Sequence, residues 1–296
     1  RMNRTYERKE DEEVVKTIRE MTDVCLDAFK DTFHRYGIEI DSFDWESEIV
    51  WSGMVESVLK NLIKTGYVMD EEREGGIVKV LDIESFLRKS GSREEFGIPK
   101  DFEVPPMVLT RSDGTTLYAT RDLAYTIWKF ENRGADYVYN VIATEQNLPQ
   151  LQLKVALKIL GIDDCYKRFV HLGYELVHLL GRKMKGRYAA YVTADDVLKE
   201  ATELAYNIVK DSNYSEEDKR KISHIVAVGA IKYSLLKTFR LKPIVFDMKK
   251  ALDLNENSAP FIQYNHARAV SILNKASKED LDFKDLDYSG ITSDIE

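Results

Sequence analysis

The segment SDGTTLYATRDLAY, residues 112–125, carries a phenol and a carboxylate four residues apart, Tyr118 and Asp122. An Asp-Gly turn opens the segment, and Thr120 could cap a helix that follows it, which would place Asp122 in the first turn. Taken alone, Asp122 is most simply a capping carboxylate that stabilises the helix by about 0.3–1 kcal/mol. The alternative is that both side chains bind a polar ligand.

Two further polar positions allow the same pair of interpretations. Glu145 and Gln146 directly follow the β-rich run 136–143, and the carboxyl ends of strands are where open α/β sheets bind ligands. They could equally be ordinary loop residues. Glu46 lies near Asp44 in an acidic segment, which is most simply a solvated turn.

A cluster of cations interrupts this acidic chain, whose net charge is −8. The loop GRKMKGRYAA, residues 181–190, contains Arg182, Lys183, Lys185 and Arg187. Such a loop could hold phosphate groups. A solvated basic loop, or one that contacts nucleic-acid phosphates, is the alternative.

The C-terminal part combines cations with aromatic side chains. Residues 232–250 hold six cations against one acid, and residues 258–269 add aromatic rings that could stack on unpaired bases. Basic helix faces are usually only solvated, and half of these rings are expected in a helix core. The candidate nucleic-acid contacts are Lys237, Arg240, Phe261, Tyr264 and Arg268.

Composition limits the class of protein. The 296 residues are 44% hydrophobic and 10% aromatic, which excludes wholesale disorder and allows two or more domains. The sequence has no apolar run long enough for a membrane span and no secretory signal, so we expect a cytosolic protein. Cys25 and Cys165 are too few for a disulfide framework or a zinc site.

Hydrophobic spacing predicts the elements that position these residues. Residues 11–36 form a helix whose apolar stripe is expected in the core, and a second helix follows from Ser52 to Gly66. Residues 67–83 predict a surface hairpin, and residues 84–106 a polar connector. Helices and strands then alternate as in half of an open α/β sheet, and the chain beyond residue 193 is helical.

These segments together resemble class I arginyl-tRNA synthetases, most closely those of the archaeal type. The resemblance covers nearly the whole chain and runs in the order of the family. The strings that carry it are FDWESEIVWSG (43–53), SDGTTLYATRDLAYTIWKFE (112–131), YNVIATEQ (139–146), GRKMKGRYAAYVTADDVLKEA (181–201) and ENSAPFIQYNHARAVSILNKA (256–276).

The resemblance implies a reaction in two steps. Arginine attacks the α-phosphate of ATP to give arginyl-adenylate and pyrophosphate, and the arginyl group then passes to the terminal ribose of tRNA(Arg). Glu46, Tyr118, Asp122 and Gln146 match the residues that bind arginine in the family. Two acids, a phenol and an amide suit a guanidinium, which has five fixed donors. ATP would be a substrate with Mg²⁺, no cofactor would be tightly bound, and no carboxylate cluster fixes a metal site.

The basic loop occupies the place of the Lys-Met-Ser-Lys-Ser-type loop of class I synthetases, which sets cations against the ATP phosphates. The resemblance makes Lys183 the main catalytic cation, supported by Lys185 and Arg187. The loop departs from the motif, because Lys185 replaces the usual serine and Gly186 the usual second lysine.

The other ATP motif of the family, His-x-Gly-His, does not occur in the sequence. The string HLGYELVH, residues 171–178, imitates it, but its fourth residue is Tyr174 and it lies late in the fold. We therefore expect a fragment that lacks the N-terminal part of the catalytic domain. An inactive fragment, a non-catalytic paralogue that binds tRNA or arginine, and a helical RNA-binding protein with an α/β accessory are the alternatives.

The fold expected from the resemblance is α/β. It comprises the second half of a Rossmann-type class I synthetase catalytic domain with an inserted α+β segment, followed by an α-helical anticodon-binding domain. The expected domains are residues 1–106, inserted and connective; 107–192, the Rossmann second half with the basic loop; and 193–296, a truncated helical stem-contact and anticodon-binding part. The expected partners are tRNA(Arg), arginine and ATP, with no membrane, and the expected state is a monomer.

Overall fold

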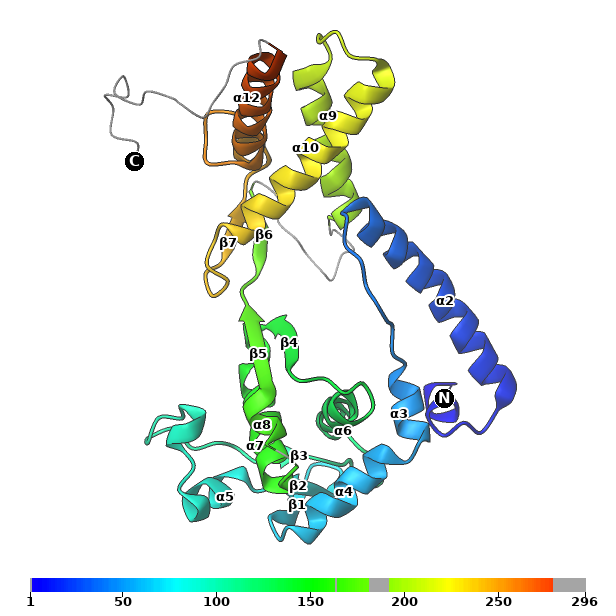
Figure 1. The fold of residues 1–296 in the computed structure, drawn as a ribbon. Helices are drawn as coiled ribbons and strands as arrows, with labels where there is room; N and C mark the ends of the chain where they lie inside the picture. Colours follow the sequence, from blue (N-terminus) through cyan, green and yellow to red (C-terminus); the bar gives the residue numbers. More distant parts are fainter. Residues whose placement is uncertain (1, 163, 181–191, 279–296) are drawn as a thin grey trace. The chain divides into compact units, whose positions relative to one another are not determined.

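The computed structural model describes residues 2–162, 164–180 and 192–278 (Figure 1). The chain forms two compact units. The first comprises Arg1–Leu176 with Arg240–Pro243, and the second comprises Val177–Phe239 with Ile244–Glu296.

The first unit opens with helices. Their bounds are α1 Met2–Glu7, α2 Glu12–Arg35, α3 Glu46–Trp51 and α4 Met54–Lys64. Asp11 caps α2, because its carboxylate accepts hydrogen bonds from the backbone N–H groups of Glu13 and Val14. The second helix expected between Ser52 and Gly66 is confirmed as α4, whereas α3 was not predicted, and Gly53, with φ of 78°, lies between the two.

The expectation that the stripe of α2 belongs to the core is wrong. No residue of α2 is buried, and Met21 and Phe29 are 64% and 60% exposed. Tyr36, directly after the helix, is buried. Apolar spacing shows that a helix has an apolar face, but it does not show what covers that face.

The predicted hairpin is confirmed. Strands β1 (Val68–Arg73) and β2 (Gly76–Leu81) pair antiparallel, and the short strand β3 (Met107–Val108) pairs antiparallel with β2. Gly75 in the turn and Gly76 at the start of β2 have φ of 102° and 122°, a region in which residues with a Cβ are strained.

The predicted connector is held by a buried carboxylate. Helix α5 (Ile83–Ser90) and the 3₁₀ turn η1 (Glu94–Phe96) lie within it. Glu84, only 8% exposed, accepts hydrogen bonds from Arg88 at 2.9 Å, from Arg93, and from the backbone N–H of Val104 at 3.1 Å. One side chain thus joins both ends of the segment.

A parallel β–α–β unit follows. Its bounds are α6 Tyr118–Glu131, β4 Val138–Ala143, η2 Thr144–Gln146, α7 Asn147–Leu160, α8 Cys165–Arg168 and β5 Phe169–Tyr174. β4 and β5 pair in parallel, with Val138 opposite Phe169. This arrangement confirms the alternating order expected from the sequence, and parallel strands joined through a helix are the repeating unit of α/β sheets.

One core unites this part of the chain. It extends from Ile49 of α3 through Leu81, Leu123 and Leu157 to Phe169 of β5. Residues on both sides of position 106 therefore share the same apolar cluster. The three functional domains expected from the sequence stay a prediction.

The β-rich run 136–143 is typical of a parallel strand covered on both faces, but this expectation is wrong for the described residues. Along β4, Val138 and Asn140 are buried, whereas Tyr139 and Val141 are exposed. The compact run of apolar residues resembled a fully buried strand, yet its burial alternates as in a sheet with one covered face.

The second unit is mainly helical, as predicted. Its bounds are β6 Val177–Leu179, α9 Ala194–Val209, α10 Glu216–Leu236, β7 Ile244–Phe246, α11 Met248–Ala251 and α12 Ala259–Lys278. Thr193 and Asp196 form a capping box at the start of α9. β6 and β7 pair in parallel. The sequence pattern did not indicate β7.

Gly229 lets α10 and α12 approach each other closely. A Cβ at this position would lie 2.7 Å from the side-chain nitrogen of Gln263. The two helices therefore pack through a position where a larger residue would force a shift.

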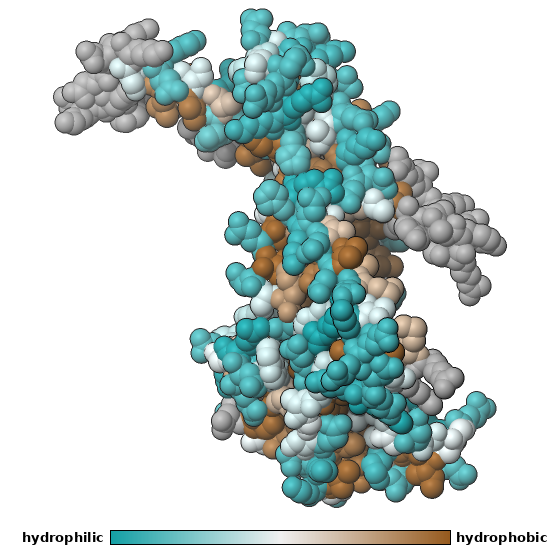
Figure 2. All heavy atoms as spheres, turned by 90° about the vertical axis from the view of Figure 1, so that its right-hand side faces the viewer, coloured by the Kyte–Doolittle hydropathy of each residue, from teal (hydrophilic) through white to brown (hydrophobic). Residues whose placement is uncertain are grey.

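The described surface mixes apolar and hydrophilic side chains (Figure 2). No described helix is long and apolar enough to cross a membrane. Cys25 is exposed and Cys165 is buried, and neither forms a disulfide within the described part of the chain.

The carboxylate of Glu84 predicts a pH-dependent stability. Burial raises its pKa, but the hydrogen bonds from Val104, Arg93 and Arg88 outweigh burial, so the pKa lies below its ordinary value. A carboxyl whose pKa is lowered by folding stabilises the fold above its unfolded pKa and loses that contribution as the pH falls through its folded pKa. Glu84→Gln should lower the free energy of unfolding at pH 7 by about 1–3 kcal/mol.

Urea unfolding followed by tryptophan fluorescence measures this effect. Trp45, Trp51 and Trp128 all belong to the first unit, so the signal reports on that unit. The difference from the unsubstituted protein should shrink as the pH falls below about 4. Glu94→Gln, at an exposed position of η1, is the control. An equal effect of both substitutions would contradict the role of Glu84.

Candidate functional site

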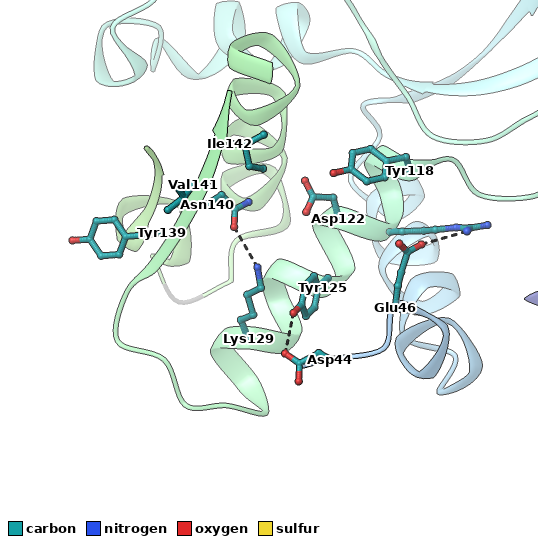
Figure 3. Close-up of a pocket in the computed structure, with 11 residues that line it drawn as sticks. Asp44, Glu46, Tyr118, Asp122, Tyr125, Lys129, Tyr139, Asn140, Val141 and Ile142 are labelled. Atoms are coloured by element: carbon teal, nitrogen blue, oxygen red, sulfur yellow. Dashed lines mark hydrogen bonds and ion pairs between the residues drawn. The ribbon is translucent and has the colours of Figure 1, made fainter. Parts of the chain in front are cut away.

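A cavity of about 490 Å³ in the first unit gathers acids and tyrosines from three parts of the chain. Helix α6 supplies one wall, the segment leading into α3 another, and β4 the third (Figure 3). Its lining residues are Asp44, Glu46, Tyr118, Arg121, Asp122, Tyr125, Lys129, Tyr139, Asn140, Val141 and Ile142.

Helix α6 has a polar face and an apolar face. Tyr118, Asp122, Tyr125 and Lys129 follow one another at steps of four, three and four, which places them on one face of a helix. All four line the cavity. The opposite face packs Leu123, Ala124, Ile127 and Phe130 into the core.

The expectation that Thr120 caps this helix is wrong. The helix begins at Tyr118, and the buried hydroxyl of Thr120 donates to the backbone carbonyl of Leu109 at 2.7 Å. Asp122 therefore lies beyond the first four helical residues. Its Oδ2 accepts a hydrogen bond from the Gln150 amide at 3.0 Å, so the simple capping interpretation of Asp122 does not apply.

The other two carboxylates are held by partners on α6. Glu46 accepts a hydrogen bond from Arg121 at 3.3 Å, and the same guanidinium reaches Glu7 at 3.0 Å. Asp44 accepts a hydrogen bond from the Tyr125 hydroxyl at 2.9 Å and forms an ion pair with Arg133. These contacts fasten the irregular segment before α3 to α6.

The carboxylate of Asp122 has a different kind of partner from the carboxylates of Glu46 and Asp44. Among the described residues it forms no direct ion pair, and its nearest polar partner is a neutral amide. Burial raises its pKa, while the Gln150 hydrogen bond and the charge of Lys129 lower it and the charge of Glu46 raises it further. The net direction is upward.

Burial and nearby charges also shift the pKa values of the groups around Asp122. Burial lowers the pKa of Lys129, although Asp122 and Asp44 act in the opposite direction. Burial and the charges of Asp122 and Glu46 raise the pKa of Tyr118. Burial, with the hydrogen bond to Asp44, raises the pKa of Tyr125 to about 12. Both phenols are therefore neutral at pH 7, and the cavity is suited to a cation.

Of the four residues expected to bind arginine, Glu46, Tyr118 and Asp122 line this cavity. Gln146 lies in η2, directly after β4, and is not among the described lining residues. Lys183, Lys185 and Arg187 lie outside the described residues. The roles of all these residues stay predictions.

The candidate tRNA contacts have different environments. On α12, Phe261 and Tyr264 are exposed, and the guanidinium of Arg268 lies over the Tyr264 ring. Lys237 donates to the backbone carbonyl of Asn257 at 2.9 Å. Arg240, in the first unit, donates to the backbone carbonyl of Gly173. The last two cations thus also have structural partners.

Sequence reasoning missed several residues of the site. The helical spacing that begins at Tyr118 could have predicted that Arg121, Tyr125 and Lys129 belong to the site. Asn140 and Gln150 carry no such signal, because their buried positions on β4 and α7 depend on how these elements pack.

Comparison with known proteins identifies the class. A family model described as "tRNA synthetases class I (R), catalytic domain" matches residues 5–248. The chain therefore belongs to this class I synthetase family, with the mixed α/β catalytic-domain fold of that class.

Relatives within the family are arginine–tRNA ligases. The chain is 42% identical over 272 residues to the arginine–tRNA ligase of Ignicoccus hospitalis, covering 92% of the chain and 43% of the relative. It is 38% identical over 291 residues to that of Sulfurisphaera tokodaii, covering 98% and 45%. The solved arginyl-tRNA synthetase of Thermus thermophilus has a TM-score of 0.76 and 30% identity, covering 92% of this chain and 47% of that one. The chain thus spans less than half the length of these relatives.

The pKa of Tyr125 provides a prediction about the site. Its hydroxyl donates to a carboxylate, which favours the neutral phenol. In protein labelled with ¹³Cζ-tyrosine, Tyr125 should stay protonated at pH 11, where an ordinary tyrosine with a pKa of about 10 is mostly ionised. Asp44→Asn should lower this pKa. Asp41→Asn, at an exposed position before it, should not, and an unchanged Tyr125 resonance in Asp44→Asn would contradict the assignment.

Proposed function

We propose that the protein is an arginine–tRNA ligase, which activates arginine with ATP and transfers it to tRNA(Arg). The observation that carries the proposal is the convergence of Glu46, Tyr118 and Asp122 on one cavity in a chain of this family. The names of the relatives support the choice of arginine.

The charges of the cavity favour a guanidinium. Glu46 and Asp44 are already paired with arginine side chains, whereas Asp122 is ionisable and half-buried with no contacting cation among the described residues. In this proposal Asp122 accepts from the planar guanidinium, while Glu46 and Tyr118 complete its surroundings. A ligand without these donors leaves buried polar groups unpaired, which can reduce kcat/KM by about 10⁴–10⁵. Gln146 would contact the arginine from the end of β4.

The ATP site depends on residues outside this cavity. Lys183, Lys185 and Arg187 are proposed to stabilise the charge on the departing pyrophosphate. The described residues contain no group of three or more His, Cys, Asp or Glu side chains that could hold a metal. They do not fit a resident Mg²⁺, so the ion is proposed to accompany ATP, and no step is assigned to it.

We also propose the domain organisation. β4, α7 and β5 would form the second half of a Rossmann-type sheet, because they provide a parallel β–α–β crossover. Residues 193–296 would form a helical part that contacts tRNA. A non-catalytic paralogue that binds tRNA or arginine is the second candidate, favoured only by the absence of a His-x-Gly-His string from the sequence.

Arginine-dependent exchange between ATP and pyrophosphate, in the full-length protein with and without tRNA, tests the proposed activity. Asp122→Asn should raise the KM for arginine by about 10- to 100-fold, because a hydrogen bond to a charged group contributes about 1.5–3 kcal/mol. Glu48→Gln, an exposed position of α3, should leave the KM unchanged.

Two outcomes separate the candidates. Absence of exchange in the unsubstituted full-length protein, with arginine or tRNA binding retained, would support the non-catalytic paralogue. Normal exchange with an unchanged KM in Asp122→Asn would remove the site assignment but leave the activity.

The face of α12 gives a separate prediction for tRNA. A stacked base contributes about 1–3 kcal/mol, so Tyr264→Ala should weaken tRNA binding by about 5- to 150-fold in a filter-binding assay. Ile262→Ala removes a side chain of similar exposure from the same helix and should have no effect. Equal affinities of the two variants would contradict a stacking role for Tyr264.

A further inference from the structure

A chain of polar side chains leads from Lys129 to Asp122 through two buried amides. The Lys129 ammonium donates to Asn140 Oδ1 at 3.2 Å (Figure 3). Asn140 Nδ2 donates to Gln150 Oε1 at 2.9 Å, and Gln150 Nε2 donates to Asp122 Oδ2 at 3.0 Å. The chain begins and ends on α6 and passes through β4 and α7.

The two ends of the chain determine the orientation of both amides. An ammonium can only donate hydrogen bonds and an ionised carboxylate can only accept them. Asn140 must therefore turn its oxygen to Lys129, and Gln150 must turn its NH₂ group to Asp122. The reverse orientation would bring an amide NH₂ group against the ammonium and an amide oxygen against the carboxylate.

We propose that Lys129, Asn140 and Gln150 form a positioning relay that holds Asp122 Oδ2 and leaves Oδ1 for the guanidinium of the substrate. The identity of the ligand rests on the proposed function, whereas the relay itself does not. All three are positioning residues, because they act through Asp122.

Burial gives the relay its energetic weight. Asn140 is 6% and Gln150 2% exposed, so neither amide can replace a lost partner with bulk water. An unpaired polar group at such a site is costly. The orientation of each amide therefore fixes the orientation of the next. Through this chain, the Lys129 ammonium determines that Gln150 turns an N–H donor to Asp122.

The separation of the two charges also matters. A contacting ion pair between Lys129 and Asp122 would occupy the carboxylate and compete with the incoming cation. The Lys129 ammonium instead lies 4.1 Å from the centre of the Tyr125 ring and bonds Asn140. It favours the ionised form of Asp122 from a distance.

Several other groups influence the Asp122 carboxylate. Those that carry charge or titrate belong to α6, α3 and the segment before α3, whereas β4 and α7 contribute the neutral amides. The groups are Tyr118, Tyr125, Lys129 and Glu46, and Asp44 acts on Tyr125 and Lys129.

The test measures the pKa of Asp122 by ¹³C NMR in the whole chain labelled with ¹³Cγ-aspartate, with Asp122→Asn to assign the resonance. Gln150→Leu should raise this pKa by about 1, because the carboxylate loses its hydrogen bond. The control is Gln152→Leu. Gln152 is a buried amide on the same helix, and it donates to the Pro105 carbonyl at 2.8 Å. The pKa of Asp122 should not change in this control.

A double-mutant cycle separates the relay from simple charge attraction. Lys129→Met should raise the pKa of Asp122 in the unsubstituted protein, but less so when Gln150→Leu has already broken the chain. If the charge of Lys129 acted only through space, the two effects would add. Additive effects would overturn the relay, as would equal pKa values in Gln150→Leu and Gln152→Leu.

If Gln150→Leu does not fold, Lys129→Met alone still decides the question. The Gln150 side-chain NH₂ protons, followed by ¹⁵N NMR, should then exchange faster with solvent, because their orientation is no longer fixed. Unchanged exchange would contradict the relay.

The kinetic arm uses the full-length protein. Gln150→Leu should raise the KM for arginine about tenfold with kcat nearly unchanged, since the relay orients a binding group. If the unsubstituted protein showed no arginine-dependent exchange, the proposed function would fail while the pKa measurements would still decide the relay.

Discussion

The two faces of helix α6 set the constraint on which the site depends. One face places Leu123, Ala124 and Ile127 in the apolar core, and the other presents Asp122 and Lys129 to the cavity. Because the buried face fixes the rotation of the helix, core packing also fixes where the acid points. A shift of α6 that relieved a packing defect would therefore move the ligand-binding groups as well.

The acids of the cavity have two kinds of contacting partner. Glu46 and Asp44 have contacting guanidinium partners. Asp122 has only an amide in contact, with the lysine charge two side chains away. A carboxylate bonded to arginine has little remaining attraction for another cation, whereas one stabilised through neutral amides retains it. The distribution of partners thus distinguishes supporting acids from the acid that faces the ligand.

Sequence patterns predicted the structural features that depend on residues close together in the chain. They missed the features that depend on how distant elements pack. The hairpin near Gly75 is a local feature, and the structure confirms that it forms. The spacing of Tyr118 and Asp122 is also local, and the two side chains share a face of α6. Thr120 was misassigned because a helix start depends on the preceding backbone as well as on the capping residue. Asn140 and Gln150 could not be connected from the sequence, since their contact requires β4 and α7 to pack in one register. The family resemblance came from long strings and needed no packing information.

The sheet formed by β4 and β5 has a consequence for the behaviour of the polypeptide in concentrated solution. Within the described residues β4 pairs only with β5, and Tyr139 and Val141 project from its uncovered face. A strand with free backbone groups along its outer edge and bare aromatic rings beside them is a template for joining another strand. Self-association through this edge should therefore increase as the chain is concentrated, and charged substitutions at Tyr139 would oppose it.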